Sequence, residues 1–157
     1  MVYRSDTTSL LYAYRSLEHQ DEIRLFKFVA TSPDIIMIEI FHAFLNQWPE
    51  YRALSYCWGE KEMVPVACAD GNQVLVTRNC QAALHRLAAE EDPTPLCIDS
   101  ICINQSNNRE RNQQVAMMRE VYSRAVKVQV YLGEESDDSS AVMDLWEEPF
   151  FSSSAWL

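Results

Sequence analysis

The residues best suited to chemistry lie in segment 96–105, which reads Leu-Cys-Ile-Asp-Ser-Ile-Cys-Ile-Asn-Gln. This segment places one carboxylate, Asp99, inside an apolar run and closes on two amides, Asn104 and Gln105. A buried carboxylate or amide must be hydrogen-bonded or used, because an unpaired polar group in the interior costs free energy. Segment 96–105 is therefore the first candidate for a functional site.

A second set of candidate residues stands at or just after the end of another apolar run and comprises Tyr56, Trp58 and Gly59. In an open parallel sheet, ligands bind beyond the carboxyl ends of the strands, where loops and helix N-termini converge. If segments 51–57 and 96–103 form neighbouring strands, their ends share one rim of the sheet. Glu110 and Gln114, in the helix expected to follow, would face the same rim. We therefore predict a binding surface at this rim.

Purely structural roles are the alternative for these residues. An aspartate in a buried strand often accepts hydrogen bonds from loop N–H groups, and an Asn-Gln pair after a strand is often part of a turn. Trp58 also suits a core anchor whose indole N–H bonds a carbonyl. The joint occurrence of the two groups favours a functional rim more than any single residue does.

Several common chemistries do not fit the sequence. The chain has three glycines, and their positions match neither the G-x-G-x-x-G loop of dinucleotide-binding folds nor a phosphate-binding P-loop. Cys102 with His85 is a conceivable nucleophile and base, but thiols buried in strands are usually inert. Cys97 and Cys102 lie five apart on a predicted strand and would point to opposite faces, which argues against a shared metal site.

Charge and hydropathy narrow the class of partner. The net charge is −10, and no basic residue follows Lys127, whereas seven acidic residues do: Glu134, Glu135, Asp137, Asp138, Asp144, Glu147 and Glu148. Such a surface repels nucleic acid and anionic lipid, so we expect neither as a partner. The five cysteines lack a C-x-x-C pair, which is typical of reduced thiols in the cytosol. The most apolar run, 35–41, is far shorter than the roughly 20 residues of a membrane-spanning helix, so we expect a soluble cytoplasmic protein.

The first half of the chain predicts strands, which cover residues 23–29, 35–40 and 51–57. A helix over 35–45 is the alternative for the second of them, because apolar residues also recur there at helical spacing. Segments 64–68 and 73–76 flank Asp70-Gly71. This pair favours a tight turn, because both residues tolerate positive φ, and it predicts a β-hairpin.

The second half predicts helices over 78–89, 107–124 and 138–148, and strands over 96–103 and 127–132. Thr77 can cap the first helix, and Asn107 with Glu110 resembles a capping box at the second. The second helix would bury a stripe formed by Val115, Met118, Tyr122 and Ala125. This order favours one α/β domain with a mostly parallel sheet, flanking helices and an inserted β-hairpin.

Three segments resemble a known family. They are Tyr-Arg-Ala-Leu-Ser-Tyr-Cys-Trp-Gly at 51–59, segment 96–105, and Glu-Arg-Asn-Gln-Gln-Val at 110–115, which is followed by Met118, Tyr122, Ala125, Val128 and Leu132-Gly133. In this order and spacing they resemble the fungal heterokaryon incompatibility (HET) domain. The resemblance covers residues 22–157 and leaves residues 1–21 as an N-terminal extension.

This resemblance implies a protein of a filamentous fungus that acts in non-self recognition. The domain would be the effector that triggers programmed death of fused incompatible cells, by assembling with itself or with protein partners. The family's distant relationship to TIR domains implies a doubly wound, flavodoxin-like sheet. Some TIR domains cleave nicotinamide from NAD with a helix glutamate, so an NAD glycohydrolase is the alternative, with Asp99, Glu110 or Glu60 as its carboxylate.

The chain departs from the family pattern at two places. Cys97 stands where the family usually has a tryptophan. Near its end the family runs through an aromatic pair, an arginine, a tryptophan and Gln-Glu, whereas this chain has Ser154 in place of the arginine and ends at Leu157. The expected glutamate would lie past Leu157, which weakens the enzymatic alternative. The sequence therefore suggests a truncated domain, and an inactive modulator of a full-length relative is a third alternative.

Overall fold

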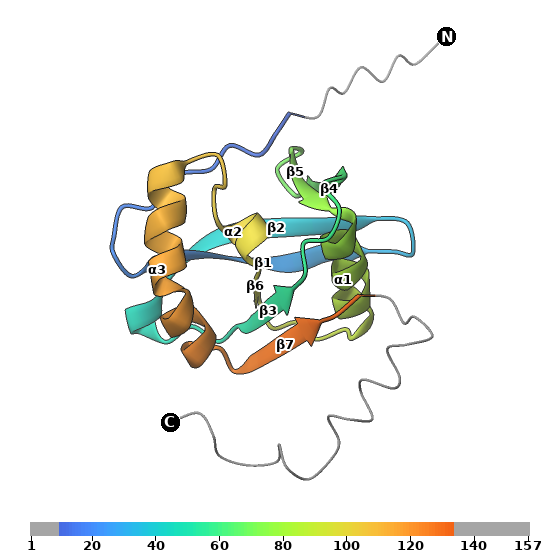
Figure 1. Ribbon diagram of the computed structural model, residues 1–157. Helices are drawn as coiled ribbons and strands as arrows, with labels where there is room; N and C mark the ends of the chain where they lie inside the picture. Colours follow the sequence, from blue (N-terminus) through green and yellow to red (C-terminus); the bar gives the residue numbers. More distant parts are fainter. Residues whose placement is uncertain (1–9, 134–157) are drawn as a thin grey trace.

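The computed structural model describes residues 10–133, which form one seven-stranded sheet with helices on its faces (Figure 1). The strands are β1 (Glu22–Thr31), β2 (Ile36–Phe44), β3 (Arg52–Tyr56), β4 (Met63–Cys68), β5 (Gln73–Thr77), β6 (Leu96–Cys97) and β7 (Lys127–Tyr131). The helices are α1 (Arg78–Ala89), α2 (Asp99–Cys102) and α3 (Asn108–Arg124), with a 3-10 turn η1 (Leu45–Gln47). The α/β class is confirmed, and the helix expected over 138–148 lies outside the described residues.

The sheet is mixed rather than mostly parallel, which corrects the prediction. Its order is β5-β4-β2-β1-β6-β3-β7. β2–β4, β6–β3 and β3–β7 are parallel, whereas β1–β2, β1–β6 and β4–β5 are antiparallel. The reason is β1, which forms a long hairpin with β2 and also runs against β6. The expected neighbours β3 and β6 do lie side by side and parallel. The relation to TIR domains stays a prediction.

The two hairpins follow from local sequence. Segment 36–44 is a strand and not a helix, because it pairs with β1 from Ile36 to Phe44, with a bulge between Phe28 and Ala30 on the β1 side. The β4–β5 hairpin turns at Gly71, whose φ of 87° is open to glycine at little cost. The Cys68 N–H donates to the Asn72 carbonyl at 2.8 Å and closes this turn.

Segment 96–103 is not a single strand, contrary to the sequence prediction. Leu96 and Cys97 pair with β1 and β3, and the chain then coils into α2. The N–H groups of Ile101 and Cys102 donate to the Ile98 carbonyl at 3.1 and 2.8 Å. Ile98, Ile101 and Cys102 are all buried. Their spacing is that of one helix face, a pattern hidden in a continuous apolar run.

Helix α3 buries a face that overlaps the predicted one only in part. Its buried residues are Glu110, Gln114 and Val121, and Met118, Tyr122 and Ala125 are partly buried. Val115, predicted in the buried stripe, is 59% exposed. Two polar side chains replace it in the interior because each has a hydrogen-bond partner there.

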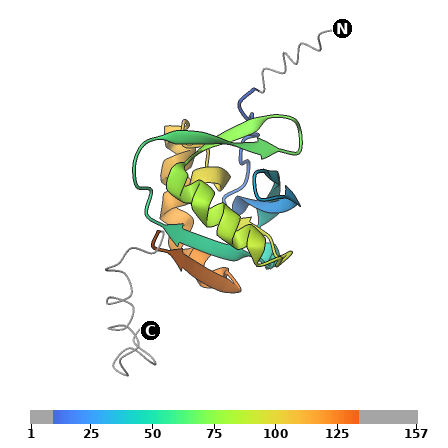
Figure 2. The ribbon, with the colours of Figure 1, turned by 90° about the vertical axis from the view of Figure 1, so that its right-hand side faces the viewer.

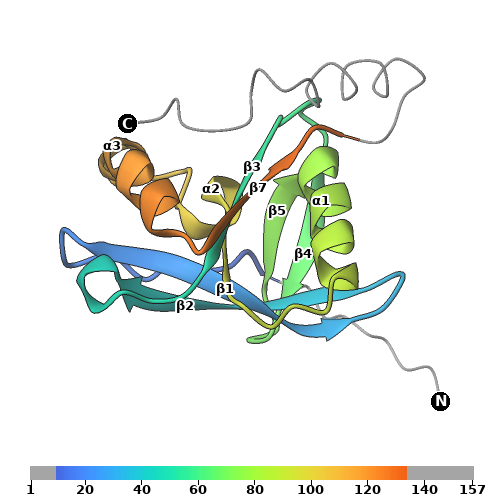
Figure 3. The same ribbon diagram turned by 90° about the horizontal axis from the view of Figure 1, so that it is seen from below.

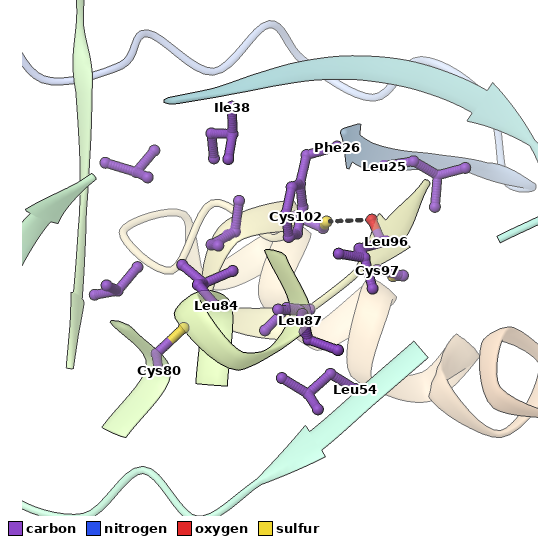
Figure 4. Close-up of a cluster of buried hydrophobic side chains, with 14 of the residues drawn as sticks. Leu25, Phe26, Ile38, Leu54, Cys80, Leu84, Leu87, Leu96, Cys97 and Cys102 are labelled. Atoms are coloured by element: carbon purple, nitrogen blue, oxygen red, sulfur yellow. Dashed lines mark hydrogen bonds between the residues drawn. The ribbon is translucent and has the colours of Figure 1, made fainter. Parts of the chain in front are cut away.

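Helix α1 covers the core of the sheet. The Thr77 side chain accepts a hydrogen bond from the Cys80 N–H at 3.2 Å and caps this helix as predicted. Leu84 and Leu87 of α1 lie among buried side chains of β1, β2, β3 and β6 (Figure 4). The Cys102 thiol donates to the Leu96 carbonyl at 3.9 Å within this cluster. The chain's five cysteines are free thiols, of which Cys57 alone is exposed.

Residues 10–21, which belong to the expected N-terminal extension, run across the domain as a strap. The Tyr12 N–H donates to the Gln73 carbonyl at 2.8 Å, so the strap lies beside β5. The Tyr14 hydroxyl donates to the Ile101 carbonyl at 2.8 Å, and both tyrosines contact the core cluster. No helix within residues 10–133 has the length and apolarity to cross a membrane.

The helices lie on opposite sides of the sheet. α1 is in front in Figure 2, with the β4–β5 hairpin along the upper edge of the view. Figure 3 places α1 on one side of β3 and β7 and α3 with α2 on the other. The end of β3 and the short helix α2 therefore meet at one edge of the sheet, where the candidate residues lie.

Candidate functional site

Tyr56 and Trp58 form an aromatic pair at the end of β3. Their rings are parallel within 2° and their centroids are 6.5 Å apart. Gly59 follows with φ of 65°, and a Cβ built there would come within 2.8 Å of Asn79 Nδ2. That amide donates to the Cys57 carbonyl at 3.0 Å. The turn after β3 is therefore fixed by α1, and only glycine fits it without strain.

Asp99 lies at the start of α2 and faces the aromatic pair. Its Oδ1 accepts a hydrogen bond from the Ser100 N–H at 2.7 Å, and the Trp58 side chain lies close enough to this carboxylate to lower its pKa. Burial raises the pKa of Asp99 above its usual 3.8, and the Ser100 N–H and the Trp58 side chain oppose the rise. The predicted meeting of Trp58 and Asp99 therefore occurs, although Asp99 stands on a helical turn and not within a strand.

Two polar residues that the sequence did not single out complete this cluster. The Cys80 thiol of α1 lies 3.5 Å from the Ser100 hydroxyl of α2. The Tyr56 hydroxyl lies beside both groups, yet it has no hydrogen bond of ordinary length and angle within residues 10–133. Burial raises the pKa values of Tyr56 and Cys80, so both stay protonated at neutral pH.

Asn104 and Gln105 belong to the same edge. The Gln105 Nε2 donates to the Asp99 carbonyl at 3.0 Å and ties the loop back onto α2. The Asn104 N–H donates to Glu110 Oε1 at 2.9 Å. Both side chains line the cleft described below, together with Trp58. The rim predicted from the two strand ends is thus brought together at five positions: Tyr56, Trp58, Asp99, Asn104 and Gln105.

Glu110 supports this loop from behind. It forms a buried ion pair with Arg24, whose Nη1 lies 2.5 Å from Oε1 and whose Nη2 lies 3.1 Å from Oε2. Arg24 is fully buried and also donates to the carbonyls of Cys102 and Arg15, at 3.1 and 2.6 Å. Both oxygens of the Glu110 carboxylate are therefore engaged in structural contacts. The sequence did not indicate that Arg24 is buried, because charged and apolar residues alternate in segment 23–29 and such a charged residue is expected to face solvent.

Gln114 and Glu60 do not join the cluster. Gln114 is buried and its Nε2 donates to the Glu22 carbonyl at 3.2 Å, next to β1. It lines a separate hollow with Glu110 and residues 16–20. Glu60 is exposed. Within residues 10–133, no group of three or more His, Cys, Asp or Glu side chains is placed to hold a metal ion.

A cleft of about 470 Å³ opens beside the cluster. One wall comes from the rim, with Trp58, Ser100, Asn104 and Gln105. The opposite wall comes from the strap and the hairpin, with Leu11, Tyr12, Tyr14, Met63, Gln73, Val74, Leu75 and Thr77. Aromatic faces combined with a few amide and hydroxyl groups suit an apolar or planar group that also forms hydrogen bonds.

Comparison with known proteins places the chain in a family. Residues 51–154 match the family described as "Heterokaryon incompatibility protein (HET)". The chain belongs to the HET family. It is also 36% identical over 165 aligned positions to "Heterokaryon incompatibility protein 6, OR allele" of Neurospora crassa. That alignment covers 92% of this HET chain and 24% of the relative, so the chain spans about a quarter of the curated relative's length. No solved structure matches the chain.

Proposed function

We propose that this HET chain acts in heterokaryon incompatibility, as a cytoplasmic signalling module of a fungal cell. Membership of the HET family, together with a relative named for incompatibility, carries the proposal. In this role the chain triggers programmed death of fused cells by assembling with itself or with a protein partner. The functional surface is the cleft edge formed by Tyr56, Trp58, Asp99, Asn104 and Gln105.

Two features of this edge support a recognition role. Trp58 is 43% exposed although it is a large aromatic residue, which makes it available to a partner. Its position is fixed by Gly59, by stacking on Tyr56 and by its contact with Asp99. A fixed, exposed tryptophan loses little conformational entropy on binding, so it is well suited to anchor a partner.

Substitution of Asp99 tests this proposal. The full chain is expressed in a filamentous fungus, and the viability of fused cells is scored. Asp99→Ala should abolish cell death while the far-ultraviolet circular dichroism spectrum of the purified protein stays unchanged. Asp34→Ala removes an exposed carboxylate in the β1–β2 turn and is the matched control. Full death activity with Asp99→Ala would remove this edge from consideration.

An NAD glycohydrolase is the second candidate function. Asp99 favours it, because this carboxylate is partly buried beside an indole at the edge of a cleft. When the bond between nicotinamide and ribose breaks, the positive charge that develops on the ribose would be stabilised by such a carboxylate, and water would complete hydrolysis. Glu110 is held by Arg24 and Asn104, which leaves Asp99 as the carboxylate for this chemistry.

Nicotinamide release separates the two candidates. The purified chain is incubated with NAD, and free nicotinamide is measured over time. The enzymatic candidate predicts release that Asp99→Asn removes and Asp34→Asn retains. Release no faster than in buffer, together with cell death in the fungus, would leave the assembly role and defeat the enzymatic one.

A further inference from the structure

An apolar stripe lies uncovered on β7, an edge strand of the sheet. Val126, Val128, Val130 and Leu132 alternate along the chain and are 61%, 46%, 65% and 74% exposed. Residues two apart on a strand point to the same face, so Val128 and Val130 share one face of β7, and Val126 and Leu132 directly precede and follow the strand. Four large exposed apolar residues on the last strand of the described sheet are the kind of surface that another segment or a partner usually covers.

The stripe continues onto α3. Val130 is the register partner of Ser55 on β3, and the Tyr122 hydroxyl of α3 donates to the carbonyl of the preceding residue, Leu54, at 3.4 Å. Val115 lies two turns before Tyr122 on this helix and is 59% exposed. The apolar surface therefore spans the angle between β7 and α3, on the side of the sheet away from α1 (Figure 3). We refer to Val115, Tyr122, Val128 and Val130 as the β7–α3 surface.

Two basic side chains flank this surface. Arg111 and Arg119 stand one turn before and one turn after Val115, and both are exposed. Neither forms an ion pair within residues 10–133. An occupant of the β7–α3 surface should therefore combine an apolar face with acidic groups.

We propose that residues 138–148 of this same chain cover the β7–α3 surface as an amphipathic helix. Val142, Leu145 and Trp146 follow helical spacing and would form its apolar face. Residues 134–157 carry seven acidic side chains and no basic one, which complements Arg111 and Arg119. β7 is followed by this segment directly, and the stretch from Gly133 to Asp138, where the helix would begin, extends over at most roughly 18 Å, so the helix stays close to β7.

The charge of the chain favours this segment over a second copy. Two copies would bring two chains of net charge −10 together, and this repulsion opposes association. The intramolecular contact instead places an acidic segment against two arginines that form no ion pair with the described part of the chain. The intramolecular contact also costs only the entropy of closing a short loop, whereas a second copy would lose the entropy of association.

Thiol labelling of the full 157-residue chain tests the contact. Cys57→Ser first removes the exposed native thiol. Leu145→Cys and Val142→Cys then place probes on the apolar face of the segment, and Asp144→Cys places a control on the opposite face. We expect both probes to react with a maleimide roughly tenfold or more slowly than the control, because labelling requires local opening. Val130→Asp, or Val115→Asp on α3, should remove this difference.

The remaining outcomes decide against the proposal. Probes that react as fast as Asp144→Cys mean that the segment leaves the β7–α3 surface open to an external partner. Protection that increases with protein concentration assigns the surface to a second copy. The buried thiols Cys68, Cys80, Cys97 and Cys102 monitor folding in the same experiment, because only an unfolded variant would label them quickly.

Discussion

Arg24 and Glu110, 86 positions apart in the chain, form a buried two-point ion pair that links β1 to the first turn of α3. Glu110 also accepts the N–H of Asn104, and Arg24 donates to the carbonyl of Cys102. The pair therefore anchors both ends of the loop that carries Asn104 and Gln105. The position of one wall of the cleft depends on two residues that do not face it.

Removing Glu110 should destabilise the fold strongly. Glu110→Ala leaves the Arg24 guanidinium buried without its counter-charge, which costs about 3–5 kcal/mol in comparable sites. Urea unfolding followed by circular dichroism measures this loss. Glu62→Ala, which breaks the fully exposed pair with Arg78, is the control and should change the midpoint little. A loss from Glu110→Ala as small as that of the control would mean that the ion pair does not hold the loop.

Replacing Gly59 should weaken the turn that presents Trp58. Gly59→Ala forces an L-residue to keep φ of 65° and pushes its Cβ towards the Asn79 amide. We expect a loss of about 1 kcal/mol in the free energy of unfolding. Gly71→Ala, at another positive φ but with open space around it, separates the backbone effect from the contact. Equal losses at the two positions would show that the Asn79 contact adds nothing.

Stability should fall in acid because of Glu22. Burial would raise the pKa of this carboxyl, but hydrogen bonds from His42 and from the N–H groups of Glu18 and His19 lower it to about 2. A lowered pKa in the folded state stabilises the fold above the unfolded value of about 4.5 and loses that contribution as pH falls towards 2.

We expect a loss on the order of 2 kcal/mol between pH 5 and pH 2 from this group. Unfolding free energies measured across this range test it. Glu22→Gln cannot ionise, so its curve should be flatter than that of the unchanged chain. Parallel curves for the two proteins would rule out Glu22 as the source.

The parts of the fold that depend on local pattern could be predicted from the sequence. α1 has the predicted bounds, Thr77 caps it, and the β4–β5 hairpin turns at Gly71. Segment 96–103 was mistaken for a strand, because an uninterrupted apolar run hides whether its period is that of a strand or a helix. The direction of β1 against β6 depends on tertiary contacts, which no local pattern records.

The candidate site was predictable only in part. Two strand ends that carry Trp58 and Asp99 were expected to meet, and they do. The sequence did not indicate Cys80 and Ser100, because their contact joins two separate helices, α1 and α2, and such a contact produces no periodic pattern in the sequence. Arg24 was missed because a charge is buried only where a distant partner compensates it, and that partner is 86 residues away.

Cell death in fused hyphae that express the Trp58→Ala chain tests the central claim most directly. Trp58→Ala removes the exposed ring from the cleft edge, whereas Trp48→Ala removes a ring that is 72% exposed and stacks on Arg124. At equal protein abundance, the account predicts that Trp58→Ala reduces the fraction of dying fusion cells at least tenfold, since losing an interfacial tryptophan costs about 2 kcal/mol or more of binding energy. Trp48→Ala should leave that fraction unchanged. Equal cell death with both variants would contradict a functional surface at Trp58 and Asp99.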